Sequence, residues 1–425
     1  MGHQADLVVI GGGPAGAISA WLAAKDGARV VLLDPDRAPA RLEGLSPRLQ
    51  DWLHRSGLPC PPDIPLVRVP RRSFWAGTAF EGNHEILVSR PAFDRHLRHC
   101  ARMAGAEVVT GTARPFSGGA RLASGRCIEA PLVLDARGRR AAPRDGTRRG
   151  PATVAIGTWL DGPPDSPAQS IVVPLDGGWL WFACGGGGRA WVQATLDAAE
   201  RGRASPARRL ADALACCADR LPPDFRPADA APVVRECSPV LSPVPGDLSV
   251  IPVGDAAAAM DPLSGHGMFW AVSGAVAVAA VRRTLKDAPG TSGQALARRF
   301  LDQRGRDIFL RQARIGRDFI RAETDRAALP FWRSRAGFPD QEPAHGRAEA
   351  VTARRQVVVR DGRLAELDVL VSARSPGGVA WYRDLPAVPL WRAHAEGADA
   401  RGLVKRYGPT AAGFPDWLAQ EADPA

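Results

Sequence analysis

A glycine-rich turn near the N-terminus constrains the fold of this chain more than any other feature. Gly11, Gly13 and Gly16 have Gly-x-Gly-x-x-Gly spacing, directly after the short apolar run 7–10 and at the start of an alanine-rich segment. The first glycine permits a tight turn, the second lets the backbone approach a pyrophosphate, and the third lets a helix pack closely on a strand. This order of strand, turn and helix predicts the first half of a dinucleotide-binding unit.

The residues around this turn extend the prediction to a complete strand–helix–strand unit. Pro14 and Ala15 stand at the expected helix N-terminus, where free N–H groups and the helix dipole favour a phosphate. A second apolar run, 28–34, ends at Asp34, which is placed to accept hydrogen bonds from an adenosine ribose. On this segment alone, a glycine turn in an unrelated α/β protein remains the alternative.

A second glycine-rich turn, within residues 250–268, decides which dinucleotide is expected. It lies between a predicted strand and a long predicted helix, so bare N–H groups would face the edge of a flavin that carries negative charge when reduced. The segment resembles the second fingerprint of the flavoprotein monooxygenase superfamily, which includes hydroxylases, geranylgeranyl reductases and flavin-dependent halogenases. The resemblance implies FAD, with Asp255 on its ribitol chain. It also implies that five residues border the isoalloxazine ring: Pro262, Gly265, His266, Gly267 and Met268.

Two further segments resemble the same superfamily. Residues 88–97 match its Arg-x-x-apolar-Asp-x-x-Leu helix, which implies that Arg90 touches FAD; the alternative is a solvated arginine at a helix start. Residues 133–139 correspond to the segment near the pyrophosphate, and Ala136 makes them closer to the halogenase-like Asp-Ala-x-Gly-Arg form than to the hydroxylase form. The resemblance also assigns Arg41 to the cofactor.

The predicted fold class is mixed α/β. We expect a Rossmann-like FAD-binding domain built from residues 1–150 and 235–345, an antiparallel-sheet substrate domain at 151–234, and a small C-terminal domain at 346–425. In the tail, Asp361 and Gly362 predict a hairpin turn. Apolar segments separated by Pro-Pro and Gly-Gly pairs predict a strand meander at 153–160, 170–175, 179–183 and 190–196.

Composition excludes several classes of protein. Hydrophobic residues make up 45% and charged residues 24% of the chain, which indicates a globular protein. The formal net charge is +10, but the arginines are scattered and only Lys25, Lys286 and Lys405 are lysines, so no nucleic-acid partner is expected. The apolar stretch 270–281 is too short to span a bilayer, so no membrane span is expected. Seven cysteines without a Cys-x-x-Cys pair, and no recognisable signal peptide, predict a cytoplasmic protein without a metal site.

Three flavin reactions compete as the activity. A halogenase resembling this chain would use a tunnel lysine near residues 43–50, but no lysine lies between Lys25 and Lys286. A geranylgeranyl-type reductase would need an apolar tunnel for a long isoprenoid, which the sequence neither supports nor excludes. Hydroxylation of an electron-rich aromatic substrate through a flavin C4a-hydroperoxide is the favoured reaction. It needs molecular oxygen and electrons from NAD(P)H, from reduced flavin or from a separate reductase.

Few residues are candidates for this chemistry. His266 is the titratable side chain inside the flavin-facing turn and is therefore the first candidate for a catalytic, proton-handling residue, although ordinary loop packing is the simpler interpretation. Glu43 and His54 are weaker candidates. Trp179 and Trp181 would share one face of the predicted sheet and line the substrate pocket. The alternative is that both tryptophans are core residues.

The C-terminal tail bears on the substrate. Its strand pair and the helical run 389–407 resemble a small winged-helix peptide-recognition unit, which would add a peptide strand to its sheet edge. The flavoprotein monooxygenases that mature tryptophylquinone cofactors, for instance in quinohemoprotein amine dehydrogenase, are similar in size and layout. That resemblance implies hydroxylation of a tryptophan in a polypeptide, with an aromatic small molecule as the other candidate substrate. A helical lid or dimer contact is the alternative for the tail, and a flavin-bound peptide escort without turnover is the non-enzyme alternative.

Overall fold

The computed structural model describes residues 3–60, 64, 66–200, 202, 204–344 and 350–422. The chain forms two compact units, Met1–Ala279 with Gln312–Gln341, and Ala280–Arg311 with Glu342–Ala425. The two long helices α5 (Gly267–Asp287) and α6 (Thr291–Ala322) each contribute residues to both units. The domain boundaries expected from the sequence stay a prediction.

A five-stranded parallel sheet within the first unit confirms the predicted strand–helix–strand unit. The strand before the first glycine turn is central, because Val8 pairs with Val31 on one side and Val133 on the other. The spatial order of the five strands is β20 (Val250–Pro252), β11 (Val133–Asp135), β2 (Leu7–Ile10), β3 (Val30–Asp34) and β7 (Glu107–Thr110). The strands β11, β2 and β3 are almost entirely buried, as is typical of parallel sheets covered on both faces, whereas the edge strand β7 is partly exposed.

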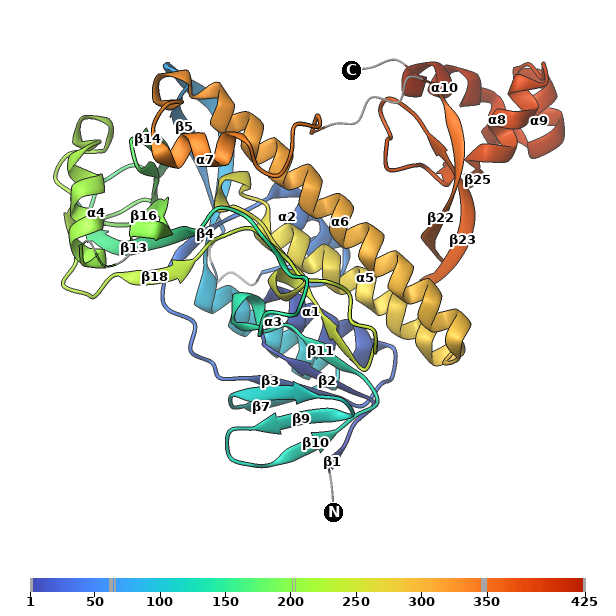
Figure 1. The fold of residues 1–425 in the computed structure, drawn as a ribbon, viewed down its shortest axis with the longest axis horizontal. Helices are drawn as coiled ribbons and strands as arrows, with labels where there is room; N and C mark the ends of the chain where they lie inside the picture. Colours follow the sequence, from blue (N-terminus) through green and yellow to red (C-terminus); the bar gives the residue numbers. More distant parts are fainter. Residues whose placement is uncertain are drawn as a thin grey trace. The chain divides into compact units, whose positions relative to one another are not determined.

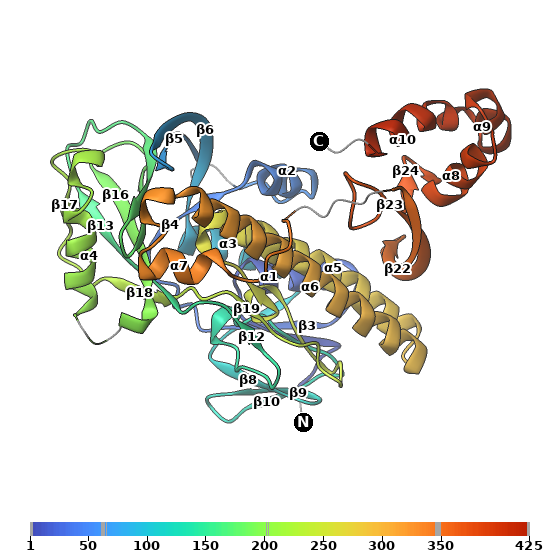
Figure 2. The same ribbon diagram turned by 45° about the horizontal axis from the view of Figure 1, so that its top comes forward.

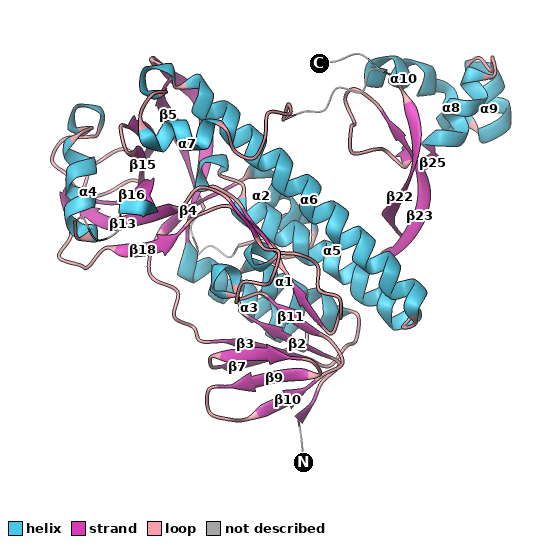
Figure 3. Ribbon diagram, in the orientation of Figure 1, coloured by secondary structure: helices cyan, strands magenta, loops and turns pink. Residues whose placement is uncertain are grey.

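Helices cover one face of this sheet and a small sheet covers the other (Figures 1 and 3). The helices are α1 (Pro14–Lys25) and α3 (Arg90–Met103), and the second of them confirms the helix predicted from residue 90. On the opposite face, Val8 and Ile10 pack against Ala120 and Ile128. The small sheet has the order β1 (His3–Gln4), β10 (Cys127–Glu129), β9 (Gly119–Leu122) and β8 (Ala113–Phe116).

A large nine-stranded sheet contains the predicted meander, and all four expected strands are confirmed. The sheet is mixed rather than antiparallel, because β14 pairs in parallel with β5, which comes from before residue 151. Residues 41–58 contribute β4 and the helix α2 (Pro47–Arg55). The nine strands are β4 (Leu42–Leu45), β5 (Val67–Trp75), β6 (Thr78–Ser89), β13 (Thr153–Asp161), β14 (Gln169–Leu175), β15 (Gly178–Cys184), β16 (Arg189–Asp197), β17 (Arg226–Pro227) and β18 (Val233–Glu236).

The two faces of the large sheet pack against different elements. Leu180 and Phe182 of β15 face a core that includes Leu210 of helix α4 (Pro206–Ala215), which Figure 2 shows beside β13 and β16. Trp179 and Trp181 share the other face, as the alternation of strand residues predicted. That face packs against the end of α6 and against α7 (Pro330–Ala336).

The second unit contains the predicted hairpin. Strands β22 (Thr352–Arg360) and β23 (Arg363–Val371) are joined by Asp361 and Gly362, whose φ angles are +51° and +73°. Two central residues with positive φ match the twist of the flanking strands, which confirms the turn prediction. The winged-helix likeness stays a prediction. The other elements of this unit are β24 (Trp381–Tyr382), β25 (Leu385–Pro386), α8 (Ala387–Ala395), α9 (Ala400–Tyr407) and α10 (Phe414–Ala422).

Within the described part of the chain, α5 is the one helix long and apolar enough to cross a membrane. Its 21 residues extend beyond the stretch 270–281 on which the sequence-based expectation rested. Half of its most apolar window, 50%, is buried inside the protein, and a core helix passes the same test of length and composition. The expectation of no membrane span therefore stays a prediction.

Candidate flavin site

Within the Gly-x-Gly-x-x-Gly motif of the first turn, a side chain would clash at Gly11 and at Gly16 but not at Gly13. Gly11 has a φ of +105°, and a Cβ there would lie 2.3 Å from the Ala136 carbonyl oxygen. A Cβ on Gly16 would lie 1.8 Å from the Gly11 carbonyl oxygen. At Gly13, by contrast, the nearest atom to a Cβ would be Arg90 Nη2, at 3.6 Å. The packing thus leaves Gly13 as the position where a ligand can approach the backbone.

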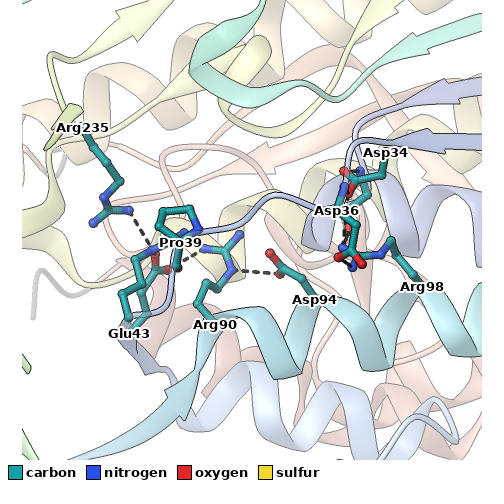
Figure 4. Close-up of polar contacts among 10 residues, drawn as sticks. Asp34, Asp36, Pro39, Glu43, Arg90, Asp94, Arg98 and Arg235 are labelled. Carbon is teal, nitrogen blue, oxygen red and sulfur yellow. Dashed lines mark hydrogen bonds and ion pairs between the residues drawn. The ribbon is translucent and has the colours of Figure 1, made fainter. Parts of the chain in front are cut away.

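The groups beside this turn can serve a phosphate and a ribose. Helix α1 begins at Pro14 without a side-chain cap, so its first N–H groups are available to an anion. Asp34 accepts the Gly12 N–H at 2.6 Å and the Asp36 N–H at 2.8 Å (Figure 4). A carboxylate has about four lone-pair sites, so Asp34 can also accept a ribose hydroxyl.

The second glycine turn folds back against the first. Gly254 has a φ of +63°, and a Cβ there would lie 2.7 Å from the Ala15 Cβ. Asp255 therefore lies next to the start of α1, with its side chain 41% exposed and Arg139 Nε 3.6 Å from its Oδ2. A short sheet of β12 (Arg148–Arg149), β19 (Val240–Leu241) and β21 (Ala258–Ala259) leads into the turn.

The part of this turn predicted to border the flavin ring is open. No atom lies within 4 Å of a Cβ built on Gly265 or on Gly267, in the described part of the chain. Pro262 begins the turn, and the buried Met268 anchors the first residues of α5 in the protein. His266 is exposed between the two glycines. Its catalytic role stays a prediction.

These features fit FAD. An uncapped helix start beside an open Gly13 suits the pyrophosphate, and the exposed carboxylate of Asp255 suits the ribitol hydroxyls. The open space at Gly265 and Gly267 suits the edge of a flavin ring. Among the described residues, no group of three or more His, Cys, Asp or Glu side chains could hold a metal ion.

A cluster of charges around Glu43 joins the flavin-binding segments to the large sheet (Figure 4). Glu43 accepts Arg41 Nε at 2.7 Å and Arg90 Nη1 at 2.6 Å, the two arginines that the family resemblance assigns to FAD. Arg235 of β18 reaches the same carboxylate at 3.2 Å and donates to Gln193 of β16 at 2.6 Å. One carboxylate therefore orients both candidate cofactor-binding guanidinium groups.

The Glu43 cluster predicts a specific acid sensitivity. Burial alone would raise the pKa of Glu43, but its three arginine partners outweigh burial and hold that pKa well below its usual range. A carboxylate whose pKa is lowered by folding stabilises the folded state fully at pH values above its pKa in the unfolded chain, about 4.3. This stabilisation is lost as the pH falls towards the pKa in the folded protein. In an acid titration followed by tryptophan fluorescence, Glu43→Gln should therefore lose stability less steeply below about pH 4.3 than the unmodified protein.

The control for this titration is Glu236→Gln, which removes an exposed pair with Arg149. Exposed pairs contribute little to stability, so the acid profile of this variant should match that of the unmodified protein. A Glu43→Gln profile that also matches the unmodified protein would contradict the assignment.

Trp179 and Trp181 lie where the large sheet meets the second glycine turn. Trp179 is 5% exposed and packs against Trp332 of α7, which is the core arrangement considered as the alternative. Trp181 is half-buried at the edge of the same cluster, which also contains Leu263 of the flavin-facing turn. Trp181 is therefore the better placed of the two predicted pocket residues.

Several site residues were not predicted from the sequence. Arg98 forms an ion pair with Asp36 (Figure 4). The sequence indicates this role only weakly, by placing Arg98 four residues after Asp94 and eight after Arg90 on one helix. Asp261 directly precedes Pro262, and burial raises the pKa of its carboxyl, which makes it a second proton-handling candidate in the turn. No nearby sequence pattern identifies Glu85, Gln193 or Arg235, because their partners come from distant strands.

No protein-family model matches the chain. Its whole length matches the solved structure of QhpG, a peptidyl tryptophan dihydroxylase essential for tryptophylquinone cofactor biogenesis, with 35% identity over 99% of both chains and a TM-score of 0.85. The chain belongs to this family of FAD-dependent hydroxylases. The predicted membership of the flavoprotein monooxygenases is thereby confirmed, as are the oxidoreductase class and the mixed α/β fold.

Other proteins match this flavoprotein hydroxylase at lower sequence identity or over a shorter part of the chain. The flavin-dependent halogenase CmlS is 16% identical over 98% of this chain and 94% of its own, with a TM-score of 0.72, which shows a shared fold. A menaquinone reductase of Mycolicibacterium smegmatis is 32% identical over 128 residues. That alignment spans 26% of this chain and 30% of the reductase. Membership of the hydroxylase family implies FAD as the cofactor, and the individual site assignments stay predictions.

Proposed function

We propose that this hydroxylase oxygenates the indole ring of a tryptophan in a polypeptide, as a step in tryptophylquinone cofactor biogenesis. The observation that carries the proposal is the match to QhpG, which covers 99% of both chains at 35% identity and so includes the C-terminal unit. The absence of lysine from the sequence between Lys25 and Lys286 argues against halogenation. The half-buried Trp181 beside the flavin-facing turn adds support, because aromatic rings pack well on one another.

The proposed reaction uses molecular oxygen and two electrons for each hydroxyl group. One oxygen atom replaces the hydrogen of an aromatic C–H bond as C–O–H, and the other leaves as water after taking up two electrons and two protons. NAD(P)H, or reduced flavin from a separate reductase, is the proposed electron source. FAD, when bound, supplies the redox chemistry.

The chain's own residues would bind the cofactor and exclude water. The start of α1 would bind the pyrophosphate, Asp34 the ribose and Asp255 the ribitol. The turn at Gly265 would donate backbone N–H groups to the edge of the flavin. The aromatic face of the large sheet would keep the reacting ring dry.

Oxygen consumption tests this proposal. Flavin-loaded protein, supplied with NAD(P)H or a flavin reductase, should consume oxygen faster when the tryptophylquinone precursor polypeptide of a quinohemoprotein amine dehydrogenase is added. The same polypeptide with phenylalanine at its tryptophan positions is the control and should give no increase. Peptide binding without oxygen consumption would instead support a peptide escort, and no response to any aromatic or peptide substrate would refute the proposal.

A cytoplasmic location is part of the proposal, because the cysteine usage indicates a reducing compartment. Cell fractionation with an antibody to the chain tests it. Recovery in the cytoplasmic fraction is the expected result, and recovery with membranes or in an exported fraction would contradict it.

A further inference from the structure

A carboxylate on the large sheet already binds an indole ring of the protein itself. Trp181 Nε1, on β15, donates to Glu85 Oε1, on β6, at 2.9 Å. Strands β14 and β5 lie between these two in the sheet, so the ring reaches across both of them. This hydrogen bond is therefore not a contact between neighbouring strands. It shows that an indole fits edge-on against Glu85 on this face.

The surface under this indole is apolar and closely packed. Val69, Leu87 and Ala183 are 0%, 2% and 0% exposed, and Trp181 packs against them. At its other side Trp181 joins the cluster that contains Leu263 of the flavin-facing turn. Glu85 is thus an acidic group at the border of an apolar platform that extends towards the predicted flavin ring. Apolar surroundings strengthen any hydrogen bond that such a carboxylate accepts.

One oxygen of Glu85 remains free to accept a second donor. In the described part of the chain, no hydrogen-bond donor reaches Oε2, and the Glu85 side chain is only partly buried. A Cβ on Gly44 would lie only 3.0 Å from this oxygen, so the glycine leaves room for Oε2 beside β4. An ionised carboxylate accepts several hydrogen bonds, and an indole N–H can only donate.

We infer that Glu85 accepts the N–H of the substrate's indole ring, and that it is the residue that selects an indole for oxygenation. This inference rests on the proposed function. A hydrogen bond from N–H to a carboxylate increases the electron density of the aromatic ring, which favours attack on an electrophilic oxygen atom. The same bond fixes the edge that the ring presents to the flavin. Removing it costs the strength of a charge-assisted hydrogen bond.

The test compares Glu85→Gln with the unmodified protein on two matched peptides. One peptide carries tryptophan, and the other carries 3-benzothienylalanine, in which sulfur replaces the N–H without changing the ring shape. The intrinsic difference in reactivity between the two rings is the same for both proteins, so the informative quantity is the change in the ratio of the two rates. That ratio should be on the order of tenfold larger for the unmodified protein than for Glu85→Gln. An equal ratio in the two proteins would overturn the inference.

Two further variants separate this role from structural effects. Trp181→Phe removes the internal N–H donor and keeps Glu85, so it should retain the preference for the tryptophan peptide. If it loses the preference as Glu85→Gln does, Glu85 acts only by holding Trp181, and the inference fails. Glu81→Gln changes an exposed carboxylate of the same strand, paired with Arg72, and should have no effect.

Binding measurements keep the test independent of turnover. By calorimetry, flavin-loaded protein should bind indole on the order of tenfold more tightly than benzothiophene, and Glu85→Gln should lose most of that preference, because an amide oxygen is a weaker acceptor than a carboxylate. If no peptide is oxygenated but this binding preference is found, the proposed function fails and the role of Glu85 stands. Equal binding of both compounds by the unmodified protein would refute that role.

Discussion

Replacing Glu43 with alanine is expected to destabilise the first unit by about 3 kcal/mol, because it leaves the buried Arg41 without its carboxylate partner and Arg90 with Asp94 alone. Arg41 and Arg90 side chains are 9% and 15% exposed, and both share the Glu43 carboxylate. Removing one partner of a buried ion pair lowers the stability of the fold strongly, because the remaining charge is neither paired nor solvated. Replacing both partners by apolar residues would cost much less. Chemical denaturation of the flavin-free protein, followed by tryptophan fluorescence, measures the change.

The matched control is Glu236→Ala. Its side chain is 43% exposed and its partner Arg149 is 47% exposed, so solvent screens the pair. The expected change is within about 0.5 kcal/mol. Equal destabilisation by the two substitutions would mean that the Glu43 cluster does not hold the flavin-binding segments together.

Replacing Gly13 with alanine is expected to weaken FAD binding on the order of 10- to 100-fold while leaving the flavin-free protein folded. The nearest atom to the added Cβ would be Arg90 Nη2 at 3.6 Å, which is ordinary van der Waals contact, so the protein itself accommodates it. The cost arises only when the pyrophosphate approaches the backbone at this position. Flavin fluorescence during titration of the flavin-free protein with FAD measures the affinity.

Gly316→Ala is the control for that titration. It lies in the interior of α6 in the first unit, and no atom lies within 4 Å of a Cβ there among the described residues. Alanine favours a helix over glycine, so this variant should be at least as stable and should bind FAD normally. Unchanged FAD affinity in Gly13→Ala would show that the pyrophosphate does not approach Gly13.

The parts of the fold that depend on local spacing were predictable from the sequence. The first glycine turn and the Asp361–Gly362 hairpin follow from conformations that few other residues adopt, and Asp34 follows from its place at the end of the next strand. The long helix after the second glycine turn was also predicted, and it occupies residues 267–287.

The parts that depend on distant partners were not predictable. The parallel pairing of β5 with β14 joins segments about 100 residues apart, and nothing in either strand specifies its partner's direction. The Glu43 cluster likewise combines β4, α3 and β18, so only the i,i+4 pair of Arg90 and Asp94 has a local signature. The contact from Trp181 to Glu85 depends on how far the sheet curves, which strand alternation does not determine.

The mass of the polypeptide product distinguishes oxygenation of tryptophan from the other flavin reactions. Flavin-loaded protein, an electron donor and molecular oxygen labelled with the heavy isotope are incubated with a tryptophan-containing precursor polypeptide, and the modified residue is located by fragmentation. One or two labelled oxygen atoms should be added to a tryptophan side chain. Addition of two hydrogen atoms, exchange of a hydrogen for a halogen, or no change in mass under conditions that oxidise the reduced flavin would contradict it.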